Sequence, residues 1–402
     1  MDSNNGNSCT PKLRFPSFDE EWVEKNMEEL CKPITPSFKL QSRDYLKSGK
    51  YPIVDQSQSL ICGWTNDDKG LVKNVPVIVF GDHTCVLKYI DFPFIQGADG
   101  VKILSPKKDY DSRFVFQSFL ANPVKPDGYK RHFSDFKEKT YLVPSPAEQQ
   151  KIASCLSEMD NLISAQSQKV ESLKTHKKGL MQQLFPQQGE TTPQLRFPGF
   201  TGDWDEKKLG DIGDTYSGLS GKSKEDFEKG NSKFITFMNV LNNVKIDTDI
   251  LGTVNITEGE RQNKVEFGDM LFNTSSETPE EVGFCAVFDS ILEEDVYLNS
   301  FCFGYRFHDR SKHLPFFLAY YMRSDCGREL MHRLAQGITR FNLSKGYFNK
   351  AIVRFPSSVE QQKIASCLSE LDKNIKSESI KLESLKNHKR GLMQQLFPEP
   401  IK

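Results

Sequence analysis

The stretch EQQKIASCLSEMDNLISAQSQKVESLKTHKKGLMQQLFP at 148–186 decides the architecture, because it returns almost unchanged at 360–398. Its first eleven residues are identical in the two copies, which lie 212 positions apart. The match resumes over ESLK and again over the final GLMQQLFP. An internal repeat of this quality sets the order of the parts before any other pattern is considered.

Apolar residues inside the repeat follow steps of three and four, the a/d heptad pattern of a coiled-coil seam. The seam residues are Ile152, Leu156, Met159, Ile163, Val170, Leu173, Leu180 and Leu184 in the first copy, and Ile364, Leu368, Leu371, Ile375, Leu382, Leu385, Leu392 and Leu396 in the second. Gln166, Lys177, Glu378 and Lys389 place polar groups in the seam, where such groups usually lower stability and help to fix register or partner choice. We predict two helices of about 35 residues, each about 50 Å long. A chain with two such helices most simply pairs them with each other, and a purely structural dimerisation hairpin is the alternative.

A second, shorter repeat precedes each globular block. PKLRFPSF at 11–18 closes at Trp22, and PQLRFPGF at 193–200 closes at Trp204. The order is therefore short motif, globular block and long helix, followed by the same three parts again. Both helices end in Leu-Phe-Pro, and the first runs on into the second short motif. Such a chain could close into a ring of two equivalent halves with its termini near each other.

The two globular blocks share a mixed α/β pattern but not a sequence. In the first, we predict strands at 75–80 and 101–104 and a short helix at 114–120. In the second, we predict strands at 234–240, 270–273, 284–288 and 301–307, and a helix at 314–334. Residues 30–147 hold 17 Lys and Arg against 12 Asp and Glu, a charge of +5, whereas residues 209–359 hold 17 against 21, a charge of −4. Identical helices on divergent blocks suggest a constant scaffold that holds two different recognition surfaces.

Composition sets the class of protein. At 402 residues the chain is long enough for two or three domains, and its net charge of −1 gives no global polycation that would indicate nucleic acid. The nine cysteines form no C-x-x-C pair and no metal-ligand spacing, which is typical of free thiols in a reducing cytosol. The apolar runs are far too short to span a bilayer, and no signal peptide is recognisable. We therefore expect a soluble, cytoplasmic protein without membrane contact.

A search for catalytic motifs finds little. GLSGKS at 218–223 imitates the end of a phosphate-binding loop, but the required glycine is replaced by Tyr216. His308 and His313 are the nearest approach to a histidine cluster, and a solvated pair is the simpler interpretation. The run DFKEK at 135–139 has the residue types of a nuclease centre without the flanking context. We expect no catalytic site, no metal site and no cofactor on this chain.

Both globular blocks approach their long helix through the pattern Gly-x-x-Arg, as GYKR at 128–131 and GITR at 337–340. A glycine-hinged loop that presents Arg suits a DNA groove or a phosphate, because the guanidinium offers a bidentate fork to guanine. The alternative is an ordinary connector whose arginine meets solvent or a surface carboxylate.

The sequence as a whole resembles the specificity subunits of Type I restriction-modification enzymes. The EQQKIA start of each helix, its Asp160 or Asp372, and the LMQQLF end are similar to the conserved regions of that family. FGDHT at 80–84, Lys88, DF at 91–92 and GADG at 97–100 resemble one recognition-domain signature, and SSETPEEVG at 275–283 with YLNSF at 297–301 resembles another. The resemblance leaves out only the first ten residues, which we expect to be a disordered leader.

The resemblance implies an α/β fold class: two globular α/β target-recognition domains separated by a pair of long antiparallel coiled-coil helices, in a pseudo-twofold circular repeat. Each domain would read one half of a split, asymmetric site in double-stranded DNA from the major groove. The implied partners are two methylation subunits, which methylate adenine at N6, and two restriction subunits. S-adenosylmethionine, ATP and Mg²⁺ would be bound by those partners, so that this chain is a non-catalytic recognition subunit.

On this basis we divide the chain at its repeats and name loop residues for DNA contact. The expected parts are the leader at 1–10, a first target-recognition domain at 11–147, a first helix at 148–186, a linker with the repeated motif at 187–208, a second target-recognition domain at 209–358, and a second helix with the C-terminus at 359–402. Side chains that suit base edges or phosphates are Gln56, Gln58, His83, Thr84, Lys88, Lys130 and Arg131 in the first domain, and Lys222, Ser223, Lys224, Asn273, Thr274, Ser275, Thr339, Arg340 and Asn342 in the second. Two alternatives stay open: a scaffold of the same shape whose domains bind proteins, and a degenerate nuclease around Asp135 and Glu138.

Overall fold

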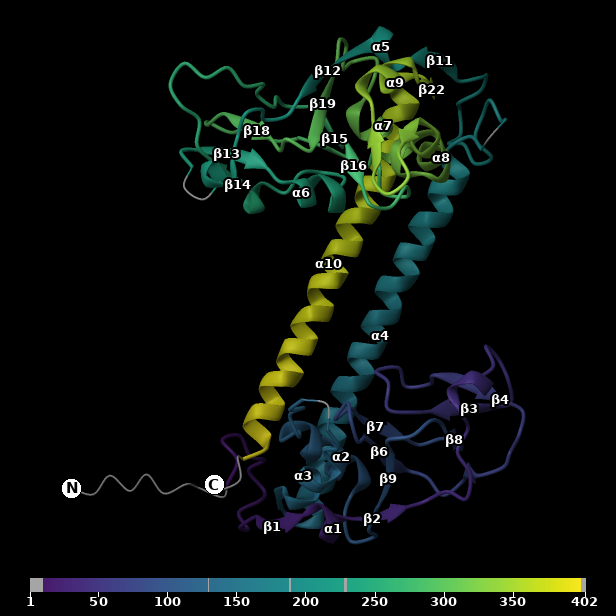
Figure 1. Ribbon diagram of the computed structural model, residues 1–402, viewed down its shortest axis with the longest axis vertical. Helices are drawn as coiled ribbons and strands as arrows, with labels where there is room; N and C mark the ends of the chain where they lie inside the picture. Colours follow the sequence, from purple (N-terminus) through teal and green to yellow (C-terminus); the bar gives the residue numbers. More distant parts are fainter. Residues whose placement is uncertain (1–9, 129, 188, 228–229, 399–402) are drawn as a thin grey trace, which may run out of the picture. The chain divides into compact units, whose positions relative to one another are not determined.

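The computed structural model describes residues 10–128, 130–187, 189–227 and 230–398. The chain forms two compact units, unit 1 from residues 1–168 and 379–402, and unit 2 from residues 169–378. Most of the expected leader lies outside the described residues. Two long helices, α4 (Pro146–Leu184) and α10 (Ser358–Leu396), are continuous in Figure 1, and each begins in one unit and ends in the other.

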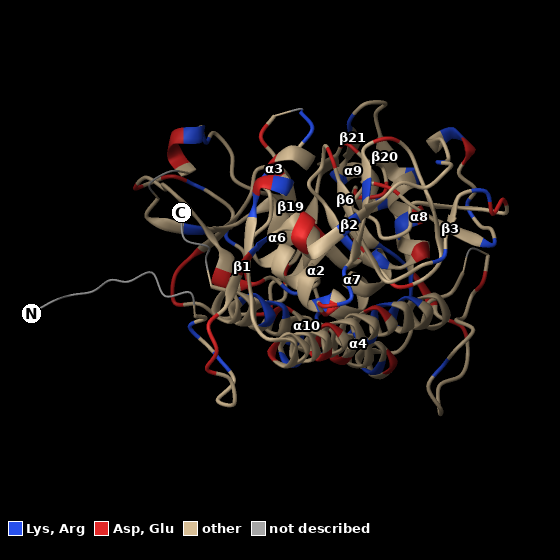
Figure 2. Ribbon diagram, turned by 90° about the horizontal axis from the view of Figure 1, so that it is seen from below, with Lys and Arg blue, Asp and Glu red and all other residues tan. Residues whose placement is uncertain are grey.

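The duplicated stretch is helical, as its heptad pattern predicts. Each helix has 39 residues, which corresponds to about 58 Å at the α-helical rise. Both begin two residues before the repeated glutamate, at Pro146 and Ser358. Both end at the leucine of the repeated Leu-Phe-Pro, because the proline two residues later cannot continue a helix. The ribbon colours of Figure 2 mark basic and acidic residues along both α4 and α10.

Within each unit, the beginning of one long helix runs antiparallel to the end of the other. In unit 1, Asp160 of α4 forms an ion pair with Lys389 of α10 at 2.5 Å. In unit 2, Lys177 pairs with Asp372 at 2.6 Å, and Lys169 pairs with Glu378 at 3.0 Å. All sixteen apolar residues named for the seam are buried or half-buried, as are the four polar ones. The three charged seam residues, Lys177, Glu378 and Lys389, therefore meet opposite charges across the helix pair.

The short repeated motif at 11–18, which we call the first LRFP loop, closes unit 1. Arg14 Nε and Nη2 donate to the two carboxylate oxygens of Glu148 at 2.9 and 2.8 Å. The Leu13 N–H donates to the carbonyl of Gln395, near the end of α10, at 3.0 Å. Glu148 is fully buried, so the carboxylate depends on this bidentate arginine.

The second LRFP loop, at 193–200, makes the same contacts in unit 2. Arg196 donates to Glu360 at 2.7 and 2.8 Å, and the Leu195 N–H donates to the carbonyl of Gln183 at 2.9 Å. The two repeats are thus parts of one device, in which the loop contacts the start of one long helix and the end of the other.

Unit 1 contains two four-stranded sheets and one strand pair. The first sheet has the order β2-β9-β6-β7 and is antiparallel: β2 Cys31–Ile34, β9 Val101–Pro106, β6 Val77–Gly81 and β7 Leu87–Ile90. The second has the order β4-β3-β8-β5: β4 Gly63–Thr65, β3 Tyr51–Val54, β8 Phe94–Gln96 and β5 Leu71–Val72. β1 (Val23–Asn26) pairs with β10 (Thr140–Val143), and the helices are α1 Met27–Leu30, η1 Ser42–Asp44, α2 Ser112–Ala121 and α3 Phe133–Glu138.

Unit 2 contains a matching set of strands. Its antiparallel sheet has the order β12-β19-β15-β17: β12 Gly213–Ser217, β19 Cys302–Phe307, β15 Met270–Asn273 and β17 Cys285–Val287. A second sheet has the order β14-β13-β18: β14 Gly252–Val254, β13 Ser232–Ile235 and β18 Val296–Leu298. A third has the order β16-β21-β20: β16 Ser275–Ser276, β21 Phe341–Leu343 and β20 Ala335–Gln336. β11 (Asp205–Lys208) pairs with β22 (Ile352–Phe355). The helices are α5 Leu209–Ile212, η2 Lys224–Phe227, α6 Phe237–Asn242, η3 Thr248–Ile250, α7 Pro315–Arg323, α8 Asp325–Leu334 and α9 Lys345–Lys350.

The two units share one topology despite their different sequences. Sheet β2-β9-β6-β7 corresponds to β12-β19-β15-β17, and β4-β3-β8 corresponds to β14-β13-β18. In both units the central strand of the second sheet, β3 or β13, has one parallel and one antiparallel neighbour. Unit 2 also has elements without a counterpart in the correspondence above, among them α6, α8 and the small sheet β16-β21-β20. The fold class is therefore confirmed as two α/β domains with two long helices in a circular repeat.

Each unit has an apolar core that the repeated motifs help to close. In unit 1, Phe80 of β6 stacks on Phe136 of α3, with ring centroids 4.6 Å apart. In unit 2, Phe272 of β15 lies 4.8 Å from Phe348 of α9 in an edge-on contact. Trp22 and Trp204, which follow the LRFP loops, are both buried in these cores. Equivalent aromatic contacts therefore hold the helix α3 or α9 on its sheet.

Six of the predicted elements are confirmed and two are wrong in part. β6, β9, α2, β15, β17 and β19 lie where the sequence predicts them. The strand predicted at 234–240 ends at Ile235, because the Thr236 side chain caps α6 by accepting from the Asn239 N–H. The helix predicted at 314–334 is two helices, because Ser324 ends α7 and caps α8 through the Gly327 N–H.

Membrane and metal features were also searched in the described part of the chain. No helix there is long and apolar enough to cross a membrane. The eight cysteines described are free thiols, and burial raises the pKa of Cys31 and Cys285 to about 12. Among the same residues, no group of three or more His, Cys, Asp or Glu side chains could hold a metal ion.

Candidate nucleic-acid interface

The loop residues named in unit 1 gather around the turn that follows β6. The Thr84 hydroxyl donates to the Gln56 carbonyl at 2.7 Å, and the His83 N–H donates to the Gln56 side-chain oxygen at 3.2 Å. The Gln56 amide nitrogen donates to the Asp99 carbonyl at 3.1 Å. The His83 ring nitrogen Nδ1 lies 3.1 Å from the Lys130 carbonyl. Four segments that are far apart in the sequence therefore form one polar surface.

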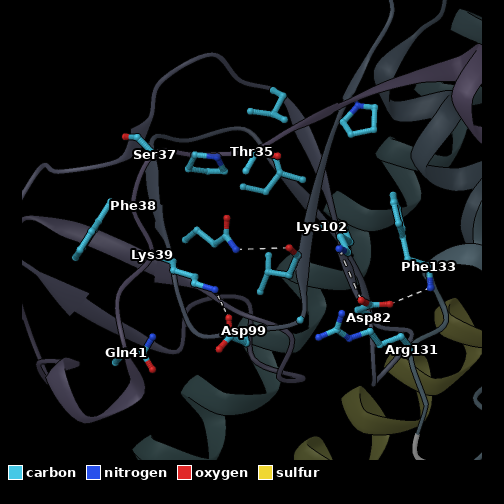
Figure 3. A pocket seen from close by; sticks show the side chains of 17 residues that line it. Thr35, Ser37, Phe38, Lys39, Gln41, Asp82, Asp99, Lys102, Arg131 and Phe133 are labelled. Atoms are coloured by element: carbon cyan, nitrogen blue, oxygen red, sulfur yellow. Dashed lines mark hydrogen bonds and ion pairs between the residues drawn. The ribbon is translucent and has the colours of Figure 1, made fainter.

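A cavity of about 620 Å³ borders this surface, and side chains from several strands point into it (Figure 3). Its charged lining consists of Lys39, Lys102, Arg131, Asp82 and Asp99. Lys39 forms an ion pair with Asp99, and the Lys102 ammonium lies 3.8 Å from the Asp82 carboxylate. The hydrogen bond and charge of Lys39, with a contribution from Arg131, lower the pKa of Asp99. The cavity is therefore polar, with one more cation than carboxylates.

The Gly-x-x-Arg loop of unit 1 presents its two basic side chains differently. Lys130 is half-exposed and forms ion pairs with Asp127 at 3.7 Å and with Asp135 at 3.3 Å. Arg131 is exposed and makes no ion pair with any residue that the structure describes. Of the alternative stated for this loop, a connector whose arginine meets solvent or a surface carboxylate, the solvent-exposed arginine is the part that the structure matches. Gln58 is also exposed, on the loop between β3 and β4.

Lys88 does not belong to this surface, and its assignment to DNA contact is wrong for this conformation. The residue is 5% exposed, and its ammonium group donates to the carbonyls of Asp55 and Ser59 at 2.7 and 2.5 Å. Burial lowers its pKa. Because β7 alternates between half-buried and buried residues, Lys88 shares the inner face with Ile90. It ties the loop at 55–59 to the sheet and cannot reach a phosphate.

In unit 2, several of the named residues gather at the small sheet β16-β21-β20. Ser275 of β16 pairs with Asn342 of β21, and the Leu343 N–H donates to the Thr274 carbonyl at 2.8 Å. Thr339 and Arg340 are exposed in the hairpin loop between β20 and β21. The exposed Asn342 amide donates to the Arg340 carbonyl at 3.3 Å.

Arg340 rests on an aromatic ring and leaves its guanidinium edges available. Its central carbon lies 5.8 Å from the ring centroid of Phe301, which is itself 55% exposed. The Thr274 hydroxyl donates to the Phe301 carbonyl, which holds that ring beside the hairpin. No residue in the described ranges forms an ion pair with Arg340. Stacking on an aromatic face orients a guanidinium without consuming its hydrogen-bond donors.

Three other named residues of unit 2 are structural. Asn273 is fully buried and donates to the Glu281 carbonyl at 2.9 Å, and Ser275 is 7% exposed. The Lys222 side chain is 6% exposed, pairs with Glu260 at 2.6 Å and thereby lowers the pKa of that glutamate to about 2. DNA contact by these side chains is therefore contradicted by their burial. The same pairing leaves the Lys222 ammonium unavailable for a nucleotide phosphate.

Ser223 and Lys224, next to Lys222, are both exposed. The Ser223 hydroxyl donates to Asp226 at 2.9 Å, which fixes the start of η2. The loop before them is held by Gln262, which exchanges hydrogen bonds with the backbone of Ser220 at 2.8 and 3.1 Å. These residues form a second exposed patch in unit 2.

Sequence inspection missed the lysines of the unit 1 cavity and the aromatic support of Arg340. Lys39 and Lys102 belong to segments with no motif of their own, and only the folded chain brings them to Arg131. Phe301 belongs to the YLNSF segment at 297–301, which the resemblance to the family includes. The sequence does not indicate that the Phe301 ring is exposed.

The alternative of a nuclease centre at Asp135 and Glu138 finds no matching geometry. The Asp135 carboxylate lies 3.1 Å from His132 Nδ1 and 3.3 Å from the Lys130 ammonium, and hydrogen bonds from these two residues lower its pKa. Glu138 is exposed at the end of α3. Through these contacts, Asp135 holds the Gly-x-x-Arg loop against the start of α3.

The fold and these loops define a tandem-domain protein in which one frame carries two unlike polar surfaces. The family model for the Type I restriction modification DNA specificity domain matches residues 19–175 and 201–387. The chain belongs to this family, which confirms the resemblance drawn from its repeated motifs.

Curated relatives match over part of their length. The specificity subunit of the Type I restriction enzyme EcoR124I/EcoR124II from Escherichia coli is 24% identical over 234 residues, which cover 54% of this chain and 54% of that subunit. The specificity subunit of the MjaVIII enzyme from Methanocaldococcus jannaschii is 30% identical over 140 residues, or 32% of this chain and 33% of that subunit. The chain thus spans about half or less of the length of these relatives.

Solved structures match over nearly the whole chain. The crystal structure of a Type I restriction-modification S subunit from M. genitalium aligns with a TM-score of 0.62 at 17% identity, covering 98% of this chain and all of that one. A chain from a study of complex assembly and conformational transition of the type I R-M system aligns with a TM-score of 0.54 at 14% identity, covering 93% and 97%. At these identities the likeness concerns the fold.

Proposed function

We propose that this chain is the DNA specificity subunit of a Type I restriction-modification complex, in which units 1 and 2 each read one half of a bipartite, asymmetric site. One observation carries the proposal: the two units share a topology and differ in the loops that present Arg131 and Arg340. A shared frame with unlike polar loops suits recognition of two different half-sites.

In unit 1, base contacts would come from the turn after β6 and the loop after β3. Gln56, Gln58 and Thr84 carry amide and hydroxyl groups that match the donor and acceptor pattern of the major groove. Lys39 and Lys102 would contact phosphates and fix the register of the unit on the duplex, whereas Arg131 offers a bidentate fork for guanine. The charge of +5 over residues 30–147 supports this division.

In unit 2, base contacts would come from the hairpin loop between β20 and β21. Arg340 offers a bidentate fork for guanine, and Thr339 and Asn342 offer smaller polar groups beside it. Lys224 would contact the backbone. Some of the carboxylates among residues 209–359, which carry a charge of −4, are paired locally, as Asp295 is with Lys264 and Asp289 is with Lys245.

The long helices would carry the docking surfaces of the partners, two methylation subunits and two restriction subunits. Exposed residues are identical in the two copies, and packing does not account for them: Gln150 and Gln362, Ser154 and Ser366, Glu158 and Glu370. Exposed positions tolerate change at little cost in stability, so their retention supports a partner that uses both copies. S-adenosylmethionine, ATP and Mg²⁺ would be bound by those partners, and this chain would have no catalytic role.

The test is long-read mapping of N6-methyladenine in cells that express this chain with its cognate methylation subunit, compared with cells that lack this chain. We expect a split, asymmetric motif that appears only when the chain is present. No new methylation, with the methylation subunit shown to be active beside another specificity chain, would favour a protein-binding scaffold instead.

The length of the long helices would set the spacer between the two half-sites. Inserting seven residues into both helices, after Gln168 and after Glu378, adds about 10 Å to each, or about three base pairs of B-DNA. We expect a changed spacer and unaltered half-sites in the methylation map. A matched control replaces seven residues at each point without changing the helix length. Altered half-sites with an unchanged spacer would refute the proposal that helix length sets the spacer.

A further inference from the structure

The hairpin β20-β21 of unit 2 places a large apolar side chain in solvent at its tip. Ile338 is 93% exposed, which no packing requirement of the unit explains. It follows Gly337, whose φ of 132° is a conformation that other residues rarely adopt, and a Cβ there would meet the Arg340 carbonyl at 2.0 Å. The turn therefore requires its glycine and presents Ile338 outward.

The surroundings of Ile338 are those of a contact surface. Thr339 and Arg340 are exposed beside it, and Arg340 is oriented by the ring of Phe301. β21 pairs with β20 on one side and with β16 on the other, so that the hairpin is anchored to the connection after β15. An apolar group, a cation and a hydroxyl thus share one protruding hairpin tip.

The dimensions and chemistry of this tip fit one ligand. The major groove of B-DNA is wide enough for a two-stranded ribbon, and the only apolar group that a base presents there is the 5-methyl group of thymine. We propose that the β20-β21 hairpin enters the major groove and that Ile338 packs on a thymine methyl group, an inference that rests on the proposed function of unit 2. Ile338 then distinguishes thymine from cytosine, while Arg340 contacts a neighbouring base.

A matched exposed isoleucine in the same unit serves as the control. Ile291 is 86% exposed, but it precedes Glu293, Glu294 and Asp295, whose carboxylates repel a phosphate backbone. The two isoleucines are therefore similar in exposure and differ in the charges of their neighbours.

The experiment measures the affinity of the complex of this chain with its methylation subunits for the mapped site. Each thymine of the two half-sites is replaced in turn by deoxyuridine, which removes only the methyl group. For the wild type and for Ile291→Ala, we expect one substitution in the half-site of unit 2 to weaken binding about fourfold, the factor that corresponds to burial of one methyl group. For Ile338→Ala, thymine and deoxyuridine at that position should bind equally.

Other outcomes overturn the proposal in distinguishable ways. If the methylation motif is present but no deoxyuridine weakens wild-type binding, or if Ile338→Ala keeps the wild-type sensitivity, the thymine contact is refuted and the proposed function stands. An insertion of Ile338 between base pairs gives that same deoxyuridine-insensitive result. If no sequence-specific binding is found at all, both the contact and the proposed function fail.

Discussion

Units 1 and 2 differ in the connection between the last two strands of their equivalent sheets. In unit 1, five residues at 82–86 join β6 to β7, whereas in unit 2 eleven residues at 274–284 join β15 to β17 and include β16. The frame beneath is the same: the Asp82 carbonyl accepts from the His132 N–H at 2.8 Å, as the Thr274 carbonyl accepts from the Leu343 N–H at 2.8 Å. The comparison shows that a fixed sheet can carry loops of different length and chemistry without altering the backbone contacts that anchor them.

The repeated residues hold this frame in both units. The LRFP loops and the long helices meet through the bidentate pairs Arg14–Glu148 and Arg196–Glu360. Gln149 and Gln361 accept from the N–H groups of Asp111 and Leu314, which start the helices α2 and α7. Identical sequence is thus found where identical geometry is needed.

The largest effect should come from breaking one of the buried pairs. We expect Glu360→Ala to destabilise unit 2 by about 3 kcal/mol and Glu148→Ala to destabilise unit 1 to the same extent, because each leaves a largely buried arginine without its carboxylate. Hydrogen exchange followed by mass spectrometry should show faster exchange only in the unit that carries the change. The exposed Glu158→Ala is the control, and equal opening of both units by either substitution would break the comparison.

A smaller effect concerns stability, which should depend on pH differently in the two units. His313 in unit 2 stacks on Phe307 and meets Phe355 edge-on, and burial, with the charge of Lys207, lowers its pKa below the ordinary 6.5. The unfolded chain then binds the proton at higher pH than the folded chain, so stability is lost as pH falls below about 6.5, by at most about 1.4 kcal/mol per pH unit. The equivalent position in unit 1, directly before Asp111, holds Tyr110 and no histidine.

Thermal unfolding at pH 7.5, 6.5 and 5.5 measures this contribution. We expect His313→Phe to lose part of the pH dependence of unit 2 and to leave that of unit 1 unchanged. An unchanged profile in the variant would show that other groups cause the acid sensitivity.

The smallest effect concerns the polar seam. Asp372 pairs with Lys177 and also accepts from the Tyr320 hydroxyl at 2.8 Å, whereas Asp160 of unit 1 is half-exposed and pairs with Lys389. We expect Asp372→Asn to cost about 1 kcal/mol and Asp160→Asn a few tenths. A double-mutant cycle with Tyr320→Phe should account for the difference, and equal costs at the two sites would contradict this account.

Local patterns predicted the long helices but not the shared topology of the units. The heptad spacing of residues such as Ile152 and Leu156 depends only on neighbours one turn away, so it survives in the sequence. Strand pairings such as β3 with β8 join residues far apart, and the two units reach the same pairings with different side chains. Short segments such as 234–240 combine strand and helix residue types, and the cap at Thr236 decides between them.

Of the residues named for DNA contact, loop residues such as Arg131 and Arg340 are exposed, whereas strand residues such as Lys88 and Asn273 are buried. The glycine of each Gly-x-x-Arg pattern indicates a loop, and both arginines are exposed there, while their contact with DNA stays a prediction. The polar residue types of Lys88 and Asn273 suggest surface positions. Both residues belong to strands, however, and their places in those strands bury the side chains. Lys39 could not be found, because its partner segment is distant in sequence and joins it only in the folded unit.

The central claim is that each unit reads its own half-site, and binding by Arg131→Ala and Arg340→Ala complexes tests it most directly. Affinity is measured for the mapped DNA site and for sites with base changes in one half at a time. The account predicts that Arg131→Ala loses about tenfold or more of its discrimination in one half and keeps it in the other, with the reverse for Arg340→Ala. If both variants lose discrimination in the same half, or if neither loses any, the account is contradicted.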